Sequence, residues 1–190
     1  NQRLPQFEAL RAAFMRVGPT YSEKRIDSLK RLRQAIVDHH KQILEAVNAE
    51  VGHRARHETF FADVIGLLGE IRHTRKHLKK WMRPRRAGWS PQFPLARARI
   101  HYQPRGVIGI TGPWNVPALL TLSPPVGATA AGNRPLIKTS EFCPRPAAVA
   151  AASAAHALAP DGVAVAHCGS AVAGPRPAAP PAPPSVTRRP

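Results

Sequence analysis

The chain has 190 residues, 43% of them hydrophobic, which is enough for one domain with a buried core and too few for two large domains. Its formal net charge is +17, and it has two cysteines, without a Cys-x-x-Cys pair or a signal-peptide pattern. This composition leads us to expect a reduced, cytoplasmic protein without structural zinc. The uncharged run 106–133 is interrupted by four prolines, so we reject a membrane span there.

The positive charge is concentrated in the segment 72–86, which carries eight Lys or Arg and two His in 15 residues. Nine of the 11 acidic residues lie at or before Glu70. Such a basic segment is typical of polyanion binding, but also of a solvated helix face. Because no motif that reads RNA or DNA accompanies the charge and aromatic residues are sparse, we favour the solvated face and expect no nucleic-acid partner.

The N-terminal segment, residues 1–95, is predicted to be helical. Apolar residues three or four apart predict a short helix that ends at Gly18, a second over Ser22–Val51 and a third over about Glu58–Met82, packed as one antiparallel layer. The third helix should turn one set of apolar residues inward: Phe61, Val64, Ile65, Leu68, Ile71, Leu78 and Trp81.

The histidines of this segment do not predict a metal site. Six of them lie before residue 96, and only His73 and His77 have an i,i+4 spacing within one clear helix. No carboxylate follows these two for over 60 residues, so the prediction for metal ions is none.

From residue 96 the pattern changes to short strands. We predict a strand over 96–103, a tight turn at 104–106 and a second strand over 106–111. The segments that follow alternate between helix and strand: helix-compatible 117–131, strand 135–138, helix 146–158 and strand 163–166. This order predicts an α/β fold with a partial Rossmann-like parallel sheet, covered on both faces. Because Pro125 follows Pro124, the residues before them should form a separate turn.

Polar residues follow two of these strands, at the edge where parallel sheets bind ligands. Asn115, in Thr-Gly-Pro-Trp-Asn, offers amide N–H groups for a developing oxyanion. Lys138 could reach a ribose hydroxyl or a phosphate, and Glu141 could accept from ribose hydroxyls. The residues are equally compatible with plain helix capping: Asn115 as a cap, and Lys-Thr-Ser-Glu as a capping box.

The stretch 103–151 contains GVIGITGPWNVP, AAGN and KTSE in this order. It resembles the first half of the cofactor domain of the aldehyde dehydrogenase superfamily, whose members typically show P-x-G-V-x-x-x-x-P-W-N-x-P, then A-L-A-A-G-N and K-P-S-E. The segment 52–86 is similar to the coniferyl-aldehyde-dehydrogenase-like branch. The resemblance implies oxidation of aldehydes, aromatic ones such as coniferaldehyde among them, to carboxylic acids with NAD or NADP.

The resemblance also implies roles for single residues. Asn115 matches the asparagine that stabilises the oxyanion, and Lys138 matches the lysine that binds the adenosine ribose. Further cofactor contacts are implied for the residues next to these two: Thr111, Gly112, Pro113, Trp114, Ser140 and Glu141. The family reaction begins with attack by a cysteine thiolate and ends with hydrolysis by water that a glutamate activates. The strand 96–103 resembles the family's oligomerisation arm, which implies a homo- or hetero-oligomer.

The nucleophilic cysteine and the general-base glutamate have no match in this chain. Cys143 stands where the family usually has Thr, and Cys168 follows a strand; both should be small, half-buried residues. We therefore expect a truncated member that is inactive alone. It would consist of helical 1–95, a partial NAD(P)-binding domain over 96–169 and a disordered, low-complexity tail over 170–190.

Two alternatives stay open from the sequence. One is a small basic module that binds nucleic acid or another polyanion through 72–86. The other is a pseudoenzyme that joins full-length relatives through its 96–103 strand. Polyanion affinity that falls steeply with salt would favour the first, and co-purification with an intact aldehyde dehydrogenase the second.

Overall fold

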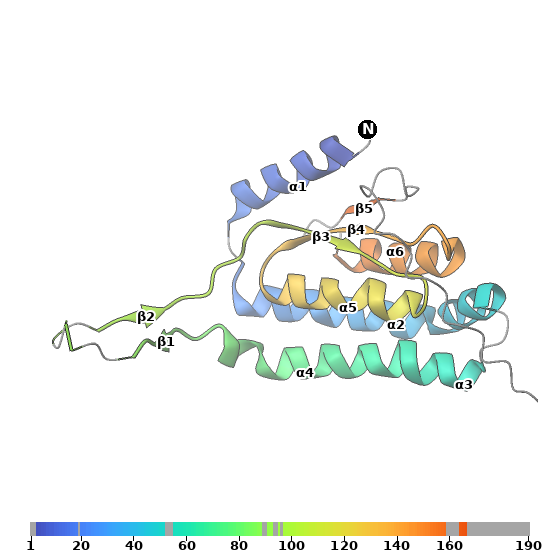
Figure 1. The fold of residues 1–190 in the computed structure, drawn as a ribbon, viewed down its shortest axis with the longest axis horizontal. Coiled ribbons are helices and arrows are strands. Elements are labelled where there is room, and N and C mark those ends of the chain that lie inside the picture. Colours follow the sequence, from blue (N-terminus) through green and yellow to red (C-terminus); the bar gives the residue numbers. More distant parts are fainter. Residues whose placement is uncertain are drawn as a thin grey trace, which may run out of the picture.

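The computed structural model describes residues 3–18, 20–51, 55–88, 91–92, 95, 97–158 and 164–166. The chain is a mixed α/β protein, as predicted (Figure 1). The expected tail at 170–190 and Cys168 lie outside the described residues. None of the described helices combines the length and the hydropathy that crossing a membrane requires.

The predicted parallel sheet is confirmed. It consists of β3 (Val107–Thr111), β4 (Arg134–Lys138) and β5 (Ala164–Ala166), hydrogen-bonded in that order. Helix α5 (Pro117–Ala130) connects β3 to β4, and α6 (Pro144–Leu158) follows β4. The register pairs the last residues of β3 and β4 with each other, so the two loops that follow begin side by side.

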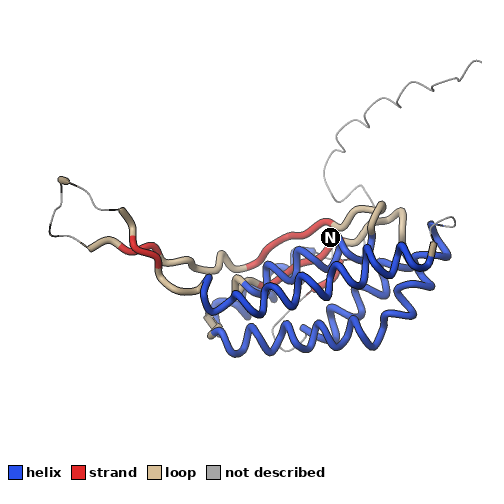
Figure 2. The backbone as a smooth tube through the Cα atoms, turned by 90° about the horizontal axis from the view of Figure 1, so that it is seen from below, coloured by secondary structure: helices blue, strands red, loops and turns tan. Residues whose placement is uncertain are grey.

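Helices cover both faces of this sheet (Figure 1), and several of them run side by side in the view from below (Figure 2). Helix α1 (Arg3–Val17) packs on one face, and α5 and α6 pack on the other. Helices α2 (Ser22–Val51) and α4 (Gly66–Trp81) pack on α5 and α6 and form a second helical layer on that side of the sheet. The prediction of one layer of three N-terminal helices is therefore wrong for α1, because the face of the sheet that α5 and α6 leave open also needs an apolar cover.

The core lies between the long α2 and the sheet helices. Its fully buried large side chains come from α2, α4, α5, α6 and β4: Leu29, Leu32, Ile36, Ile43, Val47, Leu67, Ile71, Leu122, Val126, Leu158 and Ile137. Helix α6 faces α2 with alanines, among them Ala150 and Ala154, which are completely buried. Small side chains allow the two helix backbones to approach closely, and the larger residues of α2 fill the remaining space.

The third predicted helix is interrupted by a π-turn. It consists of α3 (Arg56–Thr59), the π-helical segment η1 (Phe60–Ile65) and α4. Val64, Ile71 and Leu78 are buried as predicted. A π-turn shifts the helix register by about one residue, so the inward positions within it differ from those of an ordinary helix. Phe61 (66% exposed), Ile65 (42%) and Trp81 (47%) were expected inside, and this expectation is wrong. The buried positions of this stretch are Thr59, Asp63, Val64, Leu67, Ile71, Thr74 and Leu78.

Trp81 lies on the exposed, basic side of α4 and stacks on histidines. Its ring centroid is 5.8 Å from that of His77, which is 4.2 Å from that of His73. The buried side of α4 continues from Leu78 to the half-buried Met82 instead, which leaves Trp81 outside the core.

Helix α5 runs without a break through Pro124 and Pro125. The expected separate turn before them is wrong. Each proline removes one backbone N–H from the helix and so weakens it. Most of α5 is buried between α4, α2 and the sheet, including Leu122 and Val126, and such tertiary packing holds the helix despite the missing hydrogen bonds.

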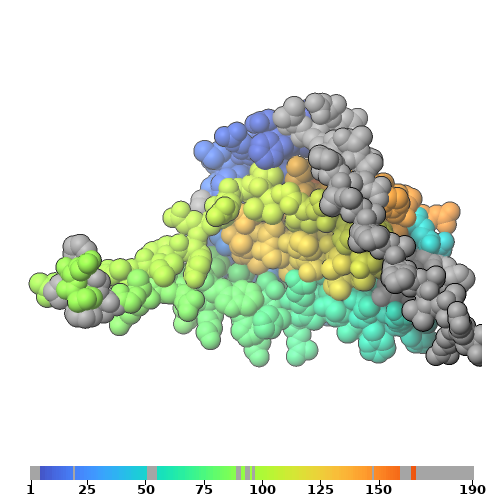
Figure 3. Space-filling model, in the orientation of Figure 1, coloured from blue at the N-terminus to red at the C-terminus, as the bar shows by residue number. Residues whose placement is uncertain are grey.

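The predicted strand over 96–103 is shorter in the structure. Among its described residues, 97–103, only Arg99–Ile100 form a strand, β2, which pairs antiparallel with β1 (Arg85–Arg86) and not with the strand that follows. The two strands extend away from the rest of the protein as an arm, which lies at the left of Figure 3. The backbone N–H groups of Arg105 and Gly106 donate instead to Oδ1 of Asn133, at 2.6 and 3.0 Å, so the chain turns into β3 without a hairpin.

Candidate functional site

The candidate site lies at the carboxyl edge of the sheet, away from the arm (Figure 1). Thr111 and Lys138 are register partners at the ends of β3 and β4. One residue further, the backbone N–H of Gly112 donates to the Lys138 carbonyl at 2.8 Å. The loop 112–116 and the loop 139–143 therefore start at the same point, as the alternating elements predicted.

Gly112 sits where the first loop passes closest to α5. It is buried, and a Cβ atom there would lie 2.3 Å from Oγ1 of Thr121. No side chain larger than hydrogen has room at this position unless Thr121 moves. The close approach fixes where the following Pro113, Trp114 and Asn115 leave the sheet.

Asn115 is exposed at the end of this loop. It does not cap α5, because Val116 occupies the N-cap position and the cap has no side-chain hydrogen bond. Among the residues that the structure describes, none makes a hydrogen bond to the Asn115 side chain. Trp114 next to it is 61% exposed.

The second loop carries an ion pair. Nζ of Lys138 lies 2.6 Å from Oε2 of Glu141, and the Lys138 side chain is only 13% exposed. Ser140 is buried, and its Oγ accepts the backbone N–H of Phe142 at 3.2 Å. The capping-box alternative is wrong, because α6 begins at Pro144 and Glu141 pairs with Lys138 instead.

Cys143 joins the two loops. Its Sγ donates to the carbonyl of Trp114 at 3.3 Å, and the residue is 5% exposed. Burial raises the pKa of the Cys143 thiol above its ordinary value, and the nearby Glu50 carboxylate raises this pKa further. A buried, protonated thiol is a poor nucleophile, so the environment of Cys143 favours a packing role.

We expect Cys143 to react with iodoacetamide at neutral pH roughly tenfold or more slowly than free cysteine, because the reactive thiolate is disfavoured and shielded. The rate can be measured by mass spectrometry on a Cys168→Ser variant, in which Cys143 is the remaining thiol. The same variant in denaturant should react at the rate of free cysteine. Equal rates in the folded and the unfolded chain would contradict the buried, protonated state.

Two carboxylates of the N-terminal helices reach this edge, and sequence reasoning missed both. Oδ1 of Asp63 accepts the backbone N–H of Leu119, and Oε1 of Glu50 accepts that of Arg145, each at 2.9 Å. A weak signal was present: both helices that begin here lack a capping Ser, Thr, Asp or Asn directly before their first proline. Such helices need acceptors from elsewhere in the fold.

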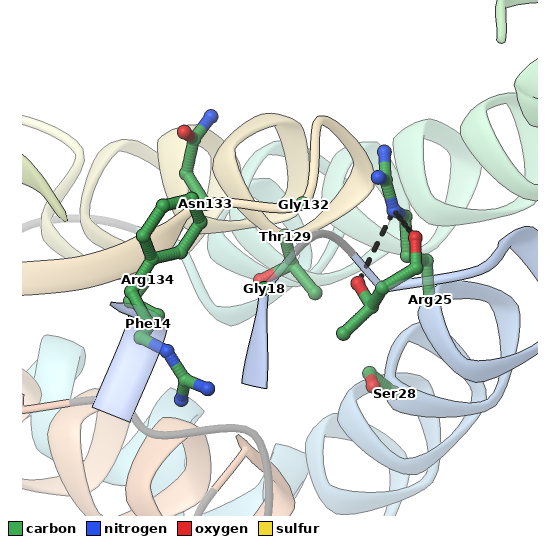
Figure 4. A pocket seen from close by; sticks show the side chains of 9 residues that line it. Phe14, Gly18, Arg25, Ser28, Thr129, Gly132, Asn133 and Arg134 are labelled. Carbon is green, nitrogen blue, oxygen red and sulfur yellow. Dashed lines mark hydrogen bonds between the residues drawn. The ribbon is translucent and has the colours of Figure 1, made fainter. Parts of the chain in front are cut away.

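A small pocket lies at the opposite end of β4 (Figure 4). It contains none of the residues predicted for the site and is lined by Phe14, Gly18, Thr20, Arg25, Ser28, Thr129, Gly132, Asn133 and Arg134. The guanidinium group of Arg25 lines it and donates to the carbonyls of Thr20 and Ala130, at 2.8 and 3.0 Å. These contacts give the pocket a structural role.

The family model "Aldehyde dehydrogenase family" matches residues 6–176. The chain therefore belongs to the aldehyde dehydrogenase family, and the resemblance found in the sequence is confirmed. Membership of this family does not favour the polyanion-binding alternative.

Coniferyl aldehyde dehydrogenases are among the similar curated proteins. The chain is 43% identical over 137 residues to a probable coniferyl aldehyde dehydrogenase of Caulobacter vibrioides, covering 70% of this chain and 28% of that protein. It is 36% identical over 144 residues to the coniferyl aldehyde dehydrogenase of a Pseudomonas species, covering 76% of this chain and 30% of that protein. The chain thus spans less than a third of the length of these relatives.

A solved structure supports the same fold. The chain superimposes on AldH of Staphylococcus aureus, described in a substrate-bound state, with a TM-score of 0.83 and 28% sequence identity. The match covers 89% of this chain and 37% of that one. The helices and the three-stranded sheet described above are therefore the arrangement of an aldehyde dehydrogenase.

Proposed function

We propose that this chain carries a cofactor-binding and oxyanion-binding part of an NAD(P)-dependent aldehyde dehydrogenase. The observation that carries the proposal is the common origin of two loops at the carboxyl edge of the sheet, one with Asn115 and one with Lys138 and Glu141. Membership of the aldehyde dehydrogenase family supports an aldehyde as the substrate. The names of the relatives support an aromatic aldehyde of the coniferaldehyde type.

The donor and acceptor groups at this edge suit a nicotinamide dinucleotide. Lys138 presents an ammonium group that can donate to a ribose hydroxyl, and Glu141 presents a carboxylate that can accept from one. Held together, they offer a diol one donor and one acceptor. A carboxylate at this place favours the free 2′-hydroxyl of NAD, whereas the lysine also suits the 2′-phosphate of NADP, so both stay within the proposal.

The loop before α5 would serve the reacting end. Thr111, Gly112, Pro113 and Trp114 are proposed to line the nicotinamide, which accepts hydride when it is bound. The amide N–H groups of Asn115 are proposed to donate to the aldehyde oxygen as negative charge develops on it. Ser140 is proposed to support the ribose contacts through the tight turn that it makes with Phe142.

Among the described residues at this edge, neither the one cysteine nor the glutamate beside it suits the role of nucleophile or general base. Cys143 is buried with a raised pKa, and Glu50 accepts the N–H of Arg145. We therefore propose that this chain binds cofactor without oxidising aldehyde by itself. A cytoplasmic location and an oligomer formed through the arm of β1 and β2, whose residues Arg99 and Ile100 are exposed, belong to the same proposal.

The proposal is tested by calorimetric titration of the purified chain with NAD and with NADP. We expect binding that weakens about tenfold or more in a Lys138→Ala/Glu141→Ala variant, because each charged hydrogen bond contributes about 1.5–3 kcal/mol. Changing both residues avoids leaving one charge unpaired. Lys80→Ala, on the exposed side of α4, is the control and should bind like the parent chain.

An assay of NADH formation with coniferaldehyde accompanies the titration. We expect no NADH above background. A folded chain that binds neither dinucleotide, or binds both equally well in the double variant, would contradict the proposed site. Glu141→Gln should shift preference toward NADP, because it removes the charge that repels a 2′-phosphate.

A further inference from the structure

Helix α5 begins without a cap of its own. Its N-cap residue, Val116, has no side-chain acceptor, and Pro117 at the first helical position has no backbone N–H. The first hydrogen bond within the helix runs from the N–H of Leu120 to the carbonyl of Val116, at 3.0 Å. The N–H of Leu119 therefore needs an acceptor from outside the helix.

Asp63 supplies this acceptor from 56 residues earlier in the chain. Its Oδ1 lies 2.9 Å from the Leu119 nitrogen, and the residue is 1% exposed. A buried carboxylate is costly unless hydrogen bonds compensate it, and the N-terminus of a helix offers N–H groups and a positive end of the helix dipole. The hydrogen bond to the first turn of α5 thus explains why a carboxylate is buried at position 63.

The π-turn η1 brings Asp63 into this position. Within it, Phe61 and Ile65 point outward, and Asp63 and Val64 are buried toward the neighbouring helices. Segment η1 also contacts α5 directly. π-turns are uncommon and often occur where function requires a particular side-chain direction. Here the turn places a carboxylate at a buried position, where an amphipathic helix would have an apolar side chain.

We propose that Asp63 is a positioning residue for Asn115. Only Val116 and Pro117 separate Asn115 from the first helical N–H groups, and the proline ring restricts the backbone there. Fixing Leu119 therefore fixes the direction in which Asn115 leaves the sheet. The opposite end of the loop is already tied by the bond from the Gly112 N–H to the Lys138 carbonyl. The role of the loop in catalysis rests on the proposed function, whereas its anchoring by Asp63 does not.

The first test needs no variant and no ligand. In the isotope-labelled full chain, a long-range HNCO spectrum detects hydrogen bonds as couplings across them. We expect a correlation from the Leu119 amide to the Asp63 carboxyl carbon. We also expect slow hydrogen exchange of the Leu119 amide. A Leu119 amide that exchanges at the rate of an unprotected one, without the correlation, would overturn the inference.

The second test separates positioning from plain stability. Asp63→Ala removes the acceptor, and Asp63→Asn keeps an acceptor oxygen. Ile71→Val is a control that removes a buried methyl group from the same helical stretch and leaves the hydrogen bond from Leu119 to Asp63 in place. We expect Asp63→Ala to speed hydrogen exchange of the amides of 114–120. It should also weaken NAD binding about tenfold, because the Leu119 N–H loses its acceptor and no longer holds the loop in its binding position. Asp63→Asn should restore most of both properties, and Ile71→Val should change neither at a temperature where all variants are folded.

The outcomes distinguish this inference from the proposed function. If the parent chain binds NAD and Asp63→Ala changes neither exchange nor affinity, the inference is overturned and the proposed function stands. If the parent chain does not bind NAD but exchange over 114–120 increases in Asp63→Ala alone, the proposed function fails and the anchoring of the loop is supported. If Asp63→Ala does not fold, exchange and affinity in Asp63→Asn decide, and a loss equal to that of Ile71→Val counts against positioning.

Discussion

Replacing Gly132 with alanine is expected to destabilise the protein by about 3 kcal/mol, from left-handed backbone strain of about 1–2 kcal/mol and overpacking of about 1–3 kcal/mol. Gly132 has a φ of +83°, and a Cβ there would lie 2.6 Å from Cζ and Nη2 of Arg25. The change in the free energy of unfolding can be measured by urea denaturation followed by circular dichroism.

Arg25 cannot move away cheaply. It is 7% exposed, and its guanidinium group is held by the carbonyls of Thr20 and Ala130, as Figure 4 shows in part. Gly132 itself ends α5. Its N–H donates to the Thr129 carbonyl, and the N–H of Asn133 donates to the Ala128 carbonyl at 2.9 Å. This closure of the helix requires the positive φ that alanine disfavours.

Gly127→Ala is the matched control for this prediction. Gly127 lies in the same helix, has an ordinary helical conformation, and would have no atom within 4 Å of an added Cβ. Alanine there should be neutral or stabilising by up to about 1 kcal/mol, because glycine is the poorer helix former. Equal effects of the two substitutions would contradict the assignment of a strained, crowded position to Gly132.

Patterns of local origin were predictable from the sequence. The bounds of α2 follow from Ser22 at its start and from an apolar spacing that continues to Val51. The strands β3 and β4 follow from short runs rich in Val, Ile and Leu between helix-compatible segments. Since parallel strands align their carboxyl ends, the common starting point of the loops after β3 and β4 also followed from the order of elements.

Features that depend on contacts distant in sequence were not predictable in this way. An apolar spacing does not show a π-turn, because the turn shifts the face by one residue and the sequence around Asp63 satisfies an ordinary helix equally well. Pro124 and Pro125 are tolerated in α5 because its surroundings bury it, which local propensity does not include. The pairing of Arg86 with Arg99 joins segments whose own patterns did not point to each other.

Replacing Gly112 with alanine is expected to affect stability and cofactor binding together. The added Cβ would lie 2.3 Å from Oγ1 and 3.2 Å from Cβ of Thr121, which is 1% exposed. Either β3 and α5 separate or the 112–116 loop shifts, at a cost of about 1–3 kcal/mol. Gly109→Ala is the control, because a Cβ at Gly109, in the preceding strand β3, would meet nothing within 4 Å.

A double-mutant cycle with Thr121→Ala identifies the cause. Thr121→Ala removes Oγ1, the nearest atom, so Gly112→Ala should cost less free energy of unfolding in that background than in the parent chain. The contact at 3.2 Å to the Thr121 Cβ remains, so the rescue should be partial. If stability is partly restored while NAD affinity stays low, the loop itself must keep its position for binding. If Gly112→Ala costs the same in both backgrounds, the crowding by Thr121 is not what requires glycine at the entrance to the Asn115 loop.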